Sequence, residues 1–418
     1  MSGKPKLVLI FLSAAIVLYG LVGGILTDVS AENDIYGQLQ MFTTVLSRLR
    51  AEYVEEPNMG RAINGALLGM IEVVDPFSSF VERDIFASLE EREEMEASAG
   101  LILSKRYGYG YVVSVIPGSP ADEAGLRTGD IVESLEGRVT TEMSLWEIVN
   151  RLKGRQGTDV TIRVVRPRRS HPTEVKLTRS VTSPGKVQAT VIEDSIGLLS
   201  IPHFNAGVSQ NVGSRLRLLL AAGVDGILVD VRGSSHGTIE EAALIADLFL
   251  DRGQLIASLA GRGGTSQEFL SEEDPLIESQ IVGLLVDGGT SGAAEVFSAA
   301  LIDNQRVFSV GLRTNGHGTI QEKFELSDGS VVFLATRLIV RPNGKPIQRK
   351  TVRTSGLRPE KRSPTQDFVT NFYFENVKEE IGDENLKEFY QELEDAVVRE
   401  QLERGLDEVR RRTLEKAA

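Results

Sequence analysis

The stretch "GLLVDGGTSGAAEVFSAALIDN", residues 283–304, has the pattern of a strand, a sharp turn and a helix. An apolar run leads into glycines, and apolar residues then recur at helical spacing. In many hydrolases such a turn holds an exposed nucleophile over the positive end of a helix. The turn offers Gly289, Thr290, Ser291 and Gly292, so a hydroxyl nucleophile here has to be Thr290 or Ser291.

Strands and helices alternate on both sides of this stretch. The alternation predicts an α/β fold with a mixed sheet, and Asp328-Gly329 predicts a hairpin turn. Strands are expected at 187–192, 196–201, 226–231, 281–286 and 306–310, and helices at 208–223, 238–250 and 293–303.

The chain before this core divides into a helical part and a part rich in strands. Helices are expected at 41–54, 59–74 and 86–100, with the second broken by "DPFSSF". Residues 101–166 contain "GSPADEAGLRTGDIV", then "SLWEIVNRLKG" and "DVTIRVV", and resemble a PDZ domain. The predicted parts are 1–31, an anchor or signal; 32–94, helical; 95–183, PDZ; 184–360, α/β core; and 361–418, a charged helical segment.

Composition limits the function. The chain of 418 residues has 46 Lys and Arg against 59 Asp and Glu, a net charge of -13, which argues against nucleic acid as a partner. The absence of cysteine excludes disulfides, a thiol nucleophile and zinc–thiolate sites. We expect no cofactor and no metal site.

The two ends predict an anchor and a covering helix. Lys4 and Lys6 precede an uncharged apolar run over residues 7–26, long enough to span a bilayer. We expect a single span in the inner membrane with the bulk of the chain in the periplasm or extracytoplasmic space; a cleaved signal ending at 29–31 is the alternative. Near the C-terminus an apolar stripe predicts a helix on the core, with partner binding as the alternative; it comprises Leu386, Phe389, Tyr390, Leu393, Val397 and Leu402.

The order of these parts resembles the carboxy-terminal processing, or tail-specific, serine proteases, which carry a PDZ domain inside the chain. The resemblance rests on "VDPFSSFVE", "GSPADEAGLRTGDIV", "IGLLSIPHFN", "GVDGILVDVRG" and "LVDGGTSGAAEVFSAALIDNQRVFSVGLRTNGHGTIQ". It implies a serine nucleophile with a lysine base 25 residues later. A buried lysine with a lowered pKa can accept the serine proton.

Laid on the family pattern, the catalytic positions of this chain are degenerate. The nucleophile position falls on Gly292 and the base position on His317, while Glu295 and Gln321 are kept. The oxyanion loop reads "RGSSHGT", with a histidine where the family has the first glycine of a pair. Its candidate residues are Gly233, Ser235, His236 and Gly237, and the His236 side chain is expected to intrude on the pocket.

The PDZ domain is expected to bind a peptide or protein C-terminus as an added strand, with its carboxylate in a glycine-rich loop. That loop is residues 98–103, and the peptide-binding residues are Gly100, Leu101, Ile102 and Leu103. Ile102 stands where the family usually has a second glycine. A PDZ domain used only as a spacer or regulator is therefore the alternative.

The sequence thus predicts a membrane-anchored, exported pseudoprotease that acts by binding peptides or proteins. It would work alone, as a homo-oligomer, or with a protease partner that it regulates. The alternative is an active peptidase using Ser291 or Thr290 with His317 as base. Two further alternatives are a metal site at His236, His317 and Asp287, and a purely structural assembly subunit.

Overall fold

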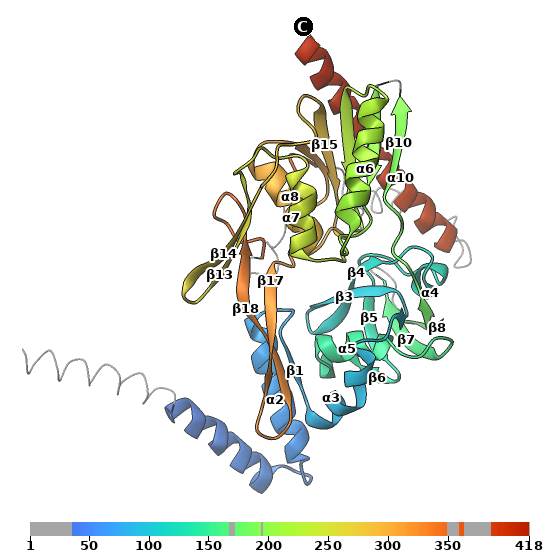
Figure 1. Cartoon of the computed structure of the whole chain (residues 1–418). Helices are drawn as coiled ribbons and strands as arrows, with labels where there is room; N and C mark the ends of the chain where they lie inside the picture. The colour runs from blue at the N-terminus through green and yellow to red at the C-terminus, as the bar shows by residue number, and fades with distance from the viewer. Residues whose placement is uncertain (1–35, 167–171, 194, 349–358, 363–385, 418) are drawn as a thin grey trace, which may run out of the picture. The chain divides into compact units, whose positions relative to one another are not determined.

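The computed structural model describes residues 36–166, 172–193, 195–348, 359–362 and 386–417 (Figure 1). The predicted anchor or signal lies outside these residues. Within the described part of the chain, no helix is both long and apolar enough to cross a bilayer. The chain divides into two compact units, one ending at Leu67 and the other beginning at Leu68.

The core of the second unit is a six-stranded sheet. Its order is β10 (Gln188–Glu193), β11 (Ile196–Ser200), β12 (Gly226–Asp230), β15 (Ile281–Val286), β16 (Phe308–Gly311) and β19 (Lys361–Arg362). β10 is antiparallel to β11 and the other pairs are parallel. The central strands are continuous apolar runs because both faces of a parallel sheet are covered. The five predicted core strands and the mixed α/β class are confirmed.

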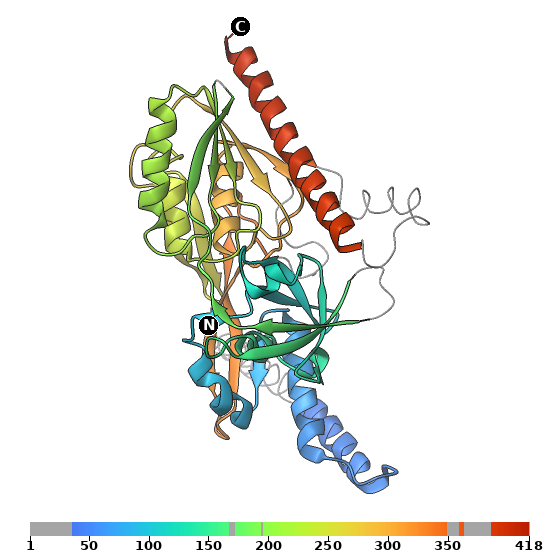
Figure 2. The same cartoon turned by 90° about the vertical axis from the view of Figure 1, so that its right-hand side faces the viewer.

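Helices cover both faces of this sheet. α6 (Val208–Ala221), α7 (Ile239–Asp247) and α8 (Ala293–Asp303) lie on one face and α10 (Leu386–Ala417) on the other (Figures 1 and 2). The predicted helices are confirmed, with shorter ends for the first two. A Cβ on Gly226 would lie 2.2 Å from the side chain of Val409 in α10. The glycine therefore allows α10 to pack closely on β12, and Leu406 and Val409 are buried there.

A second sheet has the order β1 (Ser79–Val81), β18 (Val331–Val340), β13 (Leu255–Gly261) and β14 (Gly264–Leu270), with β17 (Thr319–Glu325) paired to β18. β17 and β18 form the hairpin predicted from Asp328-Gly329. β1, β13 and β14 were not predicted. β1 and β13 pair with the distant strand β18, and β14 pairs with β13 in a hairpin.

The PDZ sheet runs β3 (Leu101–Arg106), β4 (Tyr109–Val115), β5 (Ile131–Leu135), β7 (Asp159–Val165) and β8 (Thr173–Thr178), with α5 (Leu145–Leu152) packed on it. Ser144 begins α5, since its side chain accepts the N–H of Glu147.

One helix prediction was wrong. The helix expected over 86–100 is α3 (Arg83–Leu89) followed by a single 3₁₀ turn, η1 (Glu90–Arg92). Residues Ala97–Ser98 instead form strand β2, paired with β9 (Ser180–Val181). Ala99 is fully buried in the PDZ core. Tertiary pairing therefore overrides the helical propensity of this segment.

Candidate functional site

The turn between β15 and α8 has the strand–turn–helix form that the sequence predicts. Gly292 is the N-cap of α8, with φ +58° and ψ −117°. A residue with a side chain is strained at this φ. A Cβ on Gly292 would have no heavy atom within 4 Å. The position predicted for the nucleophile therefore presents only backbone, with open space where a serine side chain would begin.

The hydroxyl of Thr290 stabilises the turn through two hydrogen bonds. Its Oγ1 donates to the carbonyl of Val231 at 2.9 Å and accepts the N–H of Asp287 at 3.0 Å. The side chain is fully buried. A hydroxyl with these partners is not available as a nucleophile.

Asp287 ties the turn to the loop that follows β12. Its Oδ1 accepts the N–H groups of Gly289 at 3.0 Å, Thr290 at 2.9 Å and Gly233 at 2.9 Å. Burial raises the pKa of Asp287, and the hydrogen bond from Gly233 and the nearby Arg232 oppose that rise. The N–H of Gly233, in the predicted oxyanion loop, is therefore already occupied.

Ser291 is buried, with 3% of its surface exposed. Its N–H donates to the carbonyl of Ser234 at 2.9 Å, and its Oγ accepts from Nδ2 of Asn315 at 3.0 Å. Among the described contacts there is no hydrogen bond between Ser291 and His317. The Ser–His pair of the alternative reading is not assembled.

His317 fills the position of the expected base. Its ring stacks on Phe77 of the "DPFSSF" segment, with centroids 4.1 Å apart and planes 13° from parallel. Burial lowers the pKa of His317 to about 4, against the pull of Asp75. The imidazole is therefore neutral near pH 7 and is a weak base.

Glu295 organises the site, although the sequence showed it only as a retained match. Its carboxylate accepts the N–H groups of Gly292 at 3.1 Å, Gly316 at 2.7 Å and His317 at 2.8 Å, and the hydroxyl of Thr314. It is fully buried, and burial raises its pKa to about 7 despite these bonds. Its place three residues after the N-cap is the spacing of a capping box, the signal that could have identified it.

The oxyanion loop is held against the neighbouring loop after β11. Phe204 N–H donates to the carbonyl of His236 at 2.7 Å. Gly237 has φ +125°, and a Cβ there would lie 2.0 Å from the carbonyl oxygen of Phe204. The His236 side chain is half-buried, and burial and the nearby His203 lower its pKa. Ser235 Oγ is buried and has no hydrogen-bond partner within the described part of the chain.

Other predicted site residues lie apart from this cluster or form no cluster. Gln321 is on β17, with its side chain exposed. The structure brings no three histidine or acidic side chains together into a cation site in the residues it describes. The sequence-based combination of His236, His317 and Asp287 is therefore not assembled as a metal site.

In the PDZ domain, β3 is at the end of the sheet order, where a peptide strand can add. Leu101 and Leu103 are buried and Ile102 is partly exposed. Gly100 has φ +84°, and a Cβ there would collide with the side chain of Ser119. This glycine is therefore required by the fold of the loop, whatever the loop binds.

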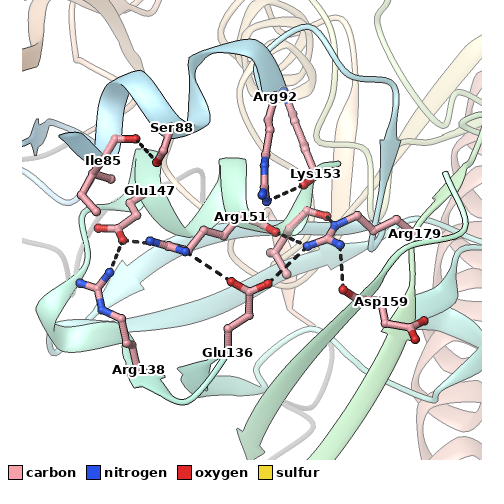
Figure 3. A network of polar contacts seen from close by, with 11 residues as sticks. Ile85, Ser88, Arg92, Glu136, Arg138, Glu147, Arg151, Lys153, Asp159 and Arg179 are labelled. Atoms are coloured by element: carbon pink, nitrogen blue, oxygen red, sulfur yellow. Dashed lines mark hydrogen bonds and ion pairs between the residues drawn. The ribbon is translucent and has the colours of Figure 1, made fainter. Parts of the chain in front are cut away.

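A polar network fixes α5, which packs beside β3 (Figure 3). Glu147 accepts from Arg138 and from Arg151, both at 2.8 Å. Arg179 donates to the carbonyls of Arg151 at 2.8 Å and Leu152 at 3.2 Å. Arg179 thus pairs with the free carbonyls at the C-terminal end of α5, as capping requires.

The PDZ domain contacts the predicted oxyanion loop directly. Ser114 on β4 donates through its hydroxyl to the carbonyl of Gly233 at 2.8 Å. Ser114 is also the β-sheet partner of Ile102 on β3. Ser114 therefore connects β3, the strand to which a peptide is expected to add, with the oxyanion loop.

Comparison with known proteins identifies the family. Residues 195–359 match the model of peptidase family S41, and residues 111–166 match a PDZ domain model. Residues 195–359 of this chain belong to peptidase family S41. The chain is 26% identical over 333 residues to the carboxy-terminal processing protease CtpA of Bacillus subtilis, covering 79% of this chain and 70% of that one. It is 25% identical over 344 residues to the carboxy-terminal-processing protease of Bartonella bacilliformis, covering 81% and 78%.

A solved structure shows the same fold. The photosystem II D1 C-terminal processing protease aligns with a TM-score of 0.63 at 24% identity, covering 77% of this chain and 86% of that chain. The predicted family and fold are thereby confirmed. These relatives are named as proteases.

Proposed function

We propose that this chain is a pseudoprotease of the S41 family that acts by binding peptides or proteins. The observation that carries the proposal is Gly292 at the N-cap of α8, where the family pattern places the nucleophile. A glycine supplies no attacking oxygen, and covalent catalysis needs one.

The environment of the base position supports the same conclusion. His317 is stacked on Phe77, and its pKa is about 4. A general base works best when its pKa lies near the working pH. Ser291 is one residue from the nucleophile position, and its Oγ is paired with Asn315. A misplacement of about 1 Å can cost 100-fold in rate.

The PDZ domain is suited to the recognition of peptides. β3 provides an edge strand, and α5 beside it is held by the polar network of Figure 3. The PDZ domain would bind extended apolar peptide ends by strand addition. If the chain regulates an active protease partner, it would bind that partner through the same β3 edge and α5.

The experiment compares hydrolysis of unfolded casein by the wild-type chain and by Ser291→Ala and His317→Ala. We expect no hydrolysis above background in any of the three. Wild-type cleavage that disappears in either variant would establish the alternative, a peptidase using Ser291 and His317.

We further propose that residues 1–31 anchor the chain in the inner membrane and that the remainder is outside the cytoplasm. Lys4 and Lys6 before an apolar run support this orientation. Protease added to spheroplasts should digest the C-terminal part. A C-terminal part that stays protected until the membrane is broken would contradict this topology.

A further inference from the structure

Two of the four histidines in the chain occupy matching positions on neighbouring loops. The loops after β11 and β12 are joined by a parallel bridge between Phe204 and Gly237. Two backbone hydrogen bonds form this bridge. The N–H of Phe204 donates to the carbonyl of His236 at 2.7 Å, and the N–H of Thr238 donates to the carbonyl of Phe204 at 3.0 Å. His203 and His236 each precede one of the two bridged residues, so they lie opposite each other.

The two imidazole rings lie on the same side of the bridge. Phe204 is fully buried, and successive side chains of extended backbone point to opposite faces, so His203 points away from the core. Matching residues of neighbouring strands are about 4.8 Å apart. Both rings are half-buried. Burial lowers the pKa of His203, and burial and then the nearby His203 lower the pKa of His236. Both rings are therefore neutral near pH 7, the form in which histidine binds metals.

Each ring has a nitrogen that a ligand can reach. Within the part of the chain that the structure describes, no hydrogen bond involves the ring of His236. Nδ1 of His203 accepts the N–H of Asn205 at 3.3 Å, a long contact at an exposed residue where water can replace the imidazole. The backbone of Gly185 forms a second hydrogen bond with the His203 ring. Metal-binding histidines usually make such a bond through the ring nitrogen that is not the ligand, and it fixes the orientation of the ring.

We propose that His203 and His236 together bind one divalent copper, nickel or zinc ion, with water in the remaining coordination positions. Ring nitrogens lie about 2.0–2.1 Å from a tetrahedral zinc ion, and hence about 3.3 Å from each other. Two imidazoles on backbones about 4.8 Å apart can reach this separation by side-chain rotation. In the described residues no pair of acidic side chains or third histidine joins them. A site of two imidazoles favours these ions over Mg²⁺ and Ca²⁺, which prefer oxygen ligands.

This pair differs from the combination of His236, His317 and Asp287 that the sequence suggested. His317 is stacked on an aromatic ring, and Asp287 already accepts three backbone N–H groups at one oxygen. The bridge between the two loops instead brings His203 beside His236. Spacing along the chain does not show this pairing, because a bulge in the second loop separates it from the register of β11 and β12.

Calorimetric titration of the untagged, full-length chain with Ni²⁺ in detergent tests the site. We expect one equivalent to bind to wild type. His203→Gln and His236→Gln should each weaken binding by about tenfold or more, because a single imidazole remains. His171→Gln, in the segment between β7 and β8, is the matched control and should bind as wild type does. Absence of binding to wild type, unchanged affinity in either pair variant, or an equal loss in His171→Gln would overturn the proposal.

Chemical modification of the wild-type chain gives a second readout that does not depend on the folding of a variant. Diethylpyrocarbonate modifies accessible neutral imidazoles, and mass spectrometry of the peptides locates the modification. Zn²⁺ should slow modification of both His203 and His236 and leave that of His171 unchanged, while Mg²⁺ should protect neither member of the pair. Equal rates with and without Zn²⁺ would contradict the site. None of these results depends on the chemistry at Gly292, so they are separable from the pseudoprotease proposal.

Discussion

The side chains of Glu295 and His317 should give opposite pH dependences of the free energy of unfolding. The backbone N–H of His317 donates to the Glu295 carboxylate at 2.8 Å; the Glu295 side chain is buried and the His317 side chain is partly buried. The pKa of Glu295 is raised from 4.5 to about 7, so the folded state holds a proton that the unfolded state releases. Its contribution to the free energy of unfolding is present below pH 4.5 and is lost as the pH rises to about 7.

His317 has the reverse sign. Its pKa is lowered from 6.5 to about 4, so the unfolded state binds a proton that the folded state excludes. The free energy of unfolding therefore rises between pH 4 and about 6.5. Each shift of about 2.5 pKa units corresponds to about 3 kcal/mol at 1.36 kcal/mol per unit. The two slopes should nearly cancel in the wild type.

Single substitutions separate the two contributions to the pH dependence of the free energy of unfolding. Glu295→Gln removes the acid, and His317→Phe removes the base while keeping a ring against Phe77. The free energy of unfolding of Glu295→Gln, measured relative to that of wild type, should rise by about 3 kcal/mol between pH 4.5 and 7. This rise is expected whatever the difference between the two proteins at pH 4.5. The free energy of unfolding of His317→Phe, measured relative to that of wild type, should fall by about 3 kcal/mol between pH 4 and 6.5.

Urea unfolding at a series of pH values measures these differences, with the fluorescence of Trp146, the single tryptophan, as the probe. Trp146 packs between Phe86 and Phe333 and reports loss of that cluster, and circular dichroism should give the same transition. Curves for both variants that run parallel to wild type across pH 4–7 would refute the assignment of buried, shifted groups at the base position.

Three further predictions concern the site, the sheet and the PDZ groove. The double substitution Gly292→Ser with His317→Lys should stay near background on casein, because the Gly233 N–H remains bonded to Asp287 and one lost oxyanion donor alone costs about 100- to 1,000-fold; activity near that of a relative would contradict this. Gly226→Val should lower the free energy of unfolding by roughly 1–3 kcal/mol, since its Cβ would overlap the α10 helix, and an unchanged urea midpoint would show that α10 yields. Ile102→Asp should weaken binding of apolar peptide ends to the full chain at least tenfold by calorimetry, and equal affinity would place the peptide elsewhere.

Much of the fold follows from local pattern. The strand–turn–helix of residues 281–303 has a buried apolar strand, a glycine turn and a helix, and the structure has β15 and α8 there. The helix expected over 86–100 failed because Ala97–Ser98 pairs with Ser180–Val181, more than 80 residues away in sequence. Local propensity carries no information on such a pairing.

The site was predictable in position and less so in its contacts. The resemblance to the family, with its spacing of 25 residues, selects Gly292 and His317, and the backbone N–H groups of both donate to Glu295. The stack of His317 on Phe77 joins residues 240 apart in the chain. The partners of Thr290 and Ser291 likewise depend on loops from other strands, so the sequence left both open as nucleophiles.

In the proposed pseudoprotease, the turn at residues 289–292 carries no reactive hydroxyl. The most direct measurement is incubation of the full-length chain with a fluorophosphonate, a covalent reagent for activated serines, followed by mass spectrometry of the peptide containing residues 283–304. We expect no adduct on Ser291 or Thr290, while an active S41 relative is labelled under the same conditions. A stoichiometric adduct on Ser291 that is lost in His317→Ala would establish Ser291 as a working nucleophile and overturn the pseudoprotease proposal.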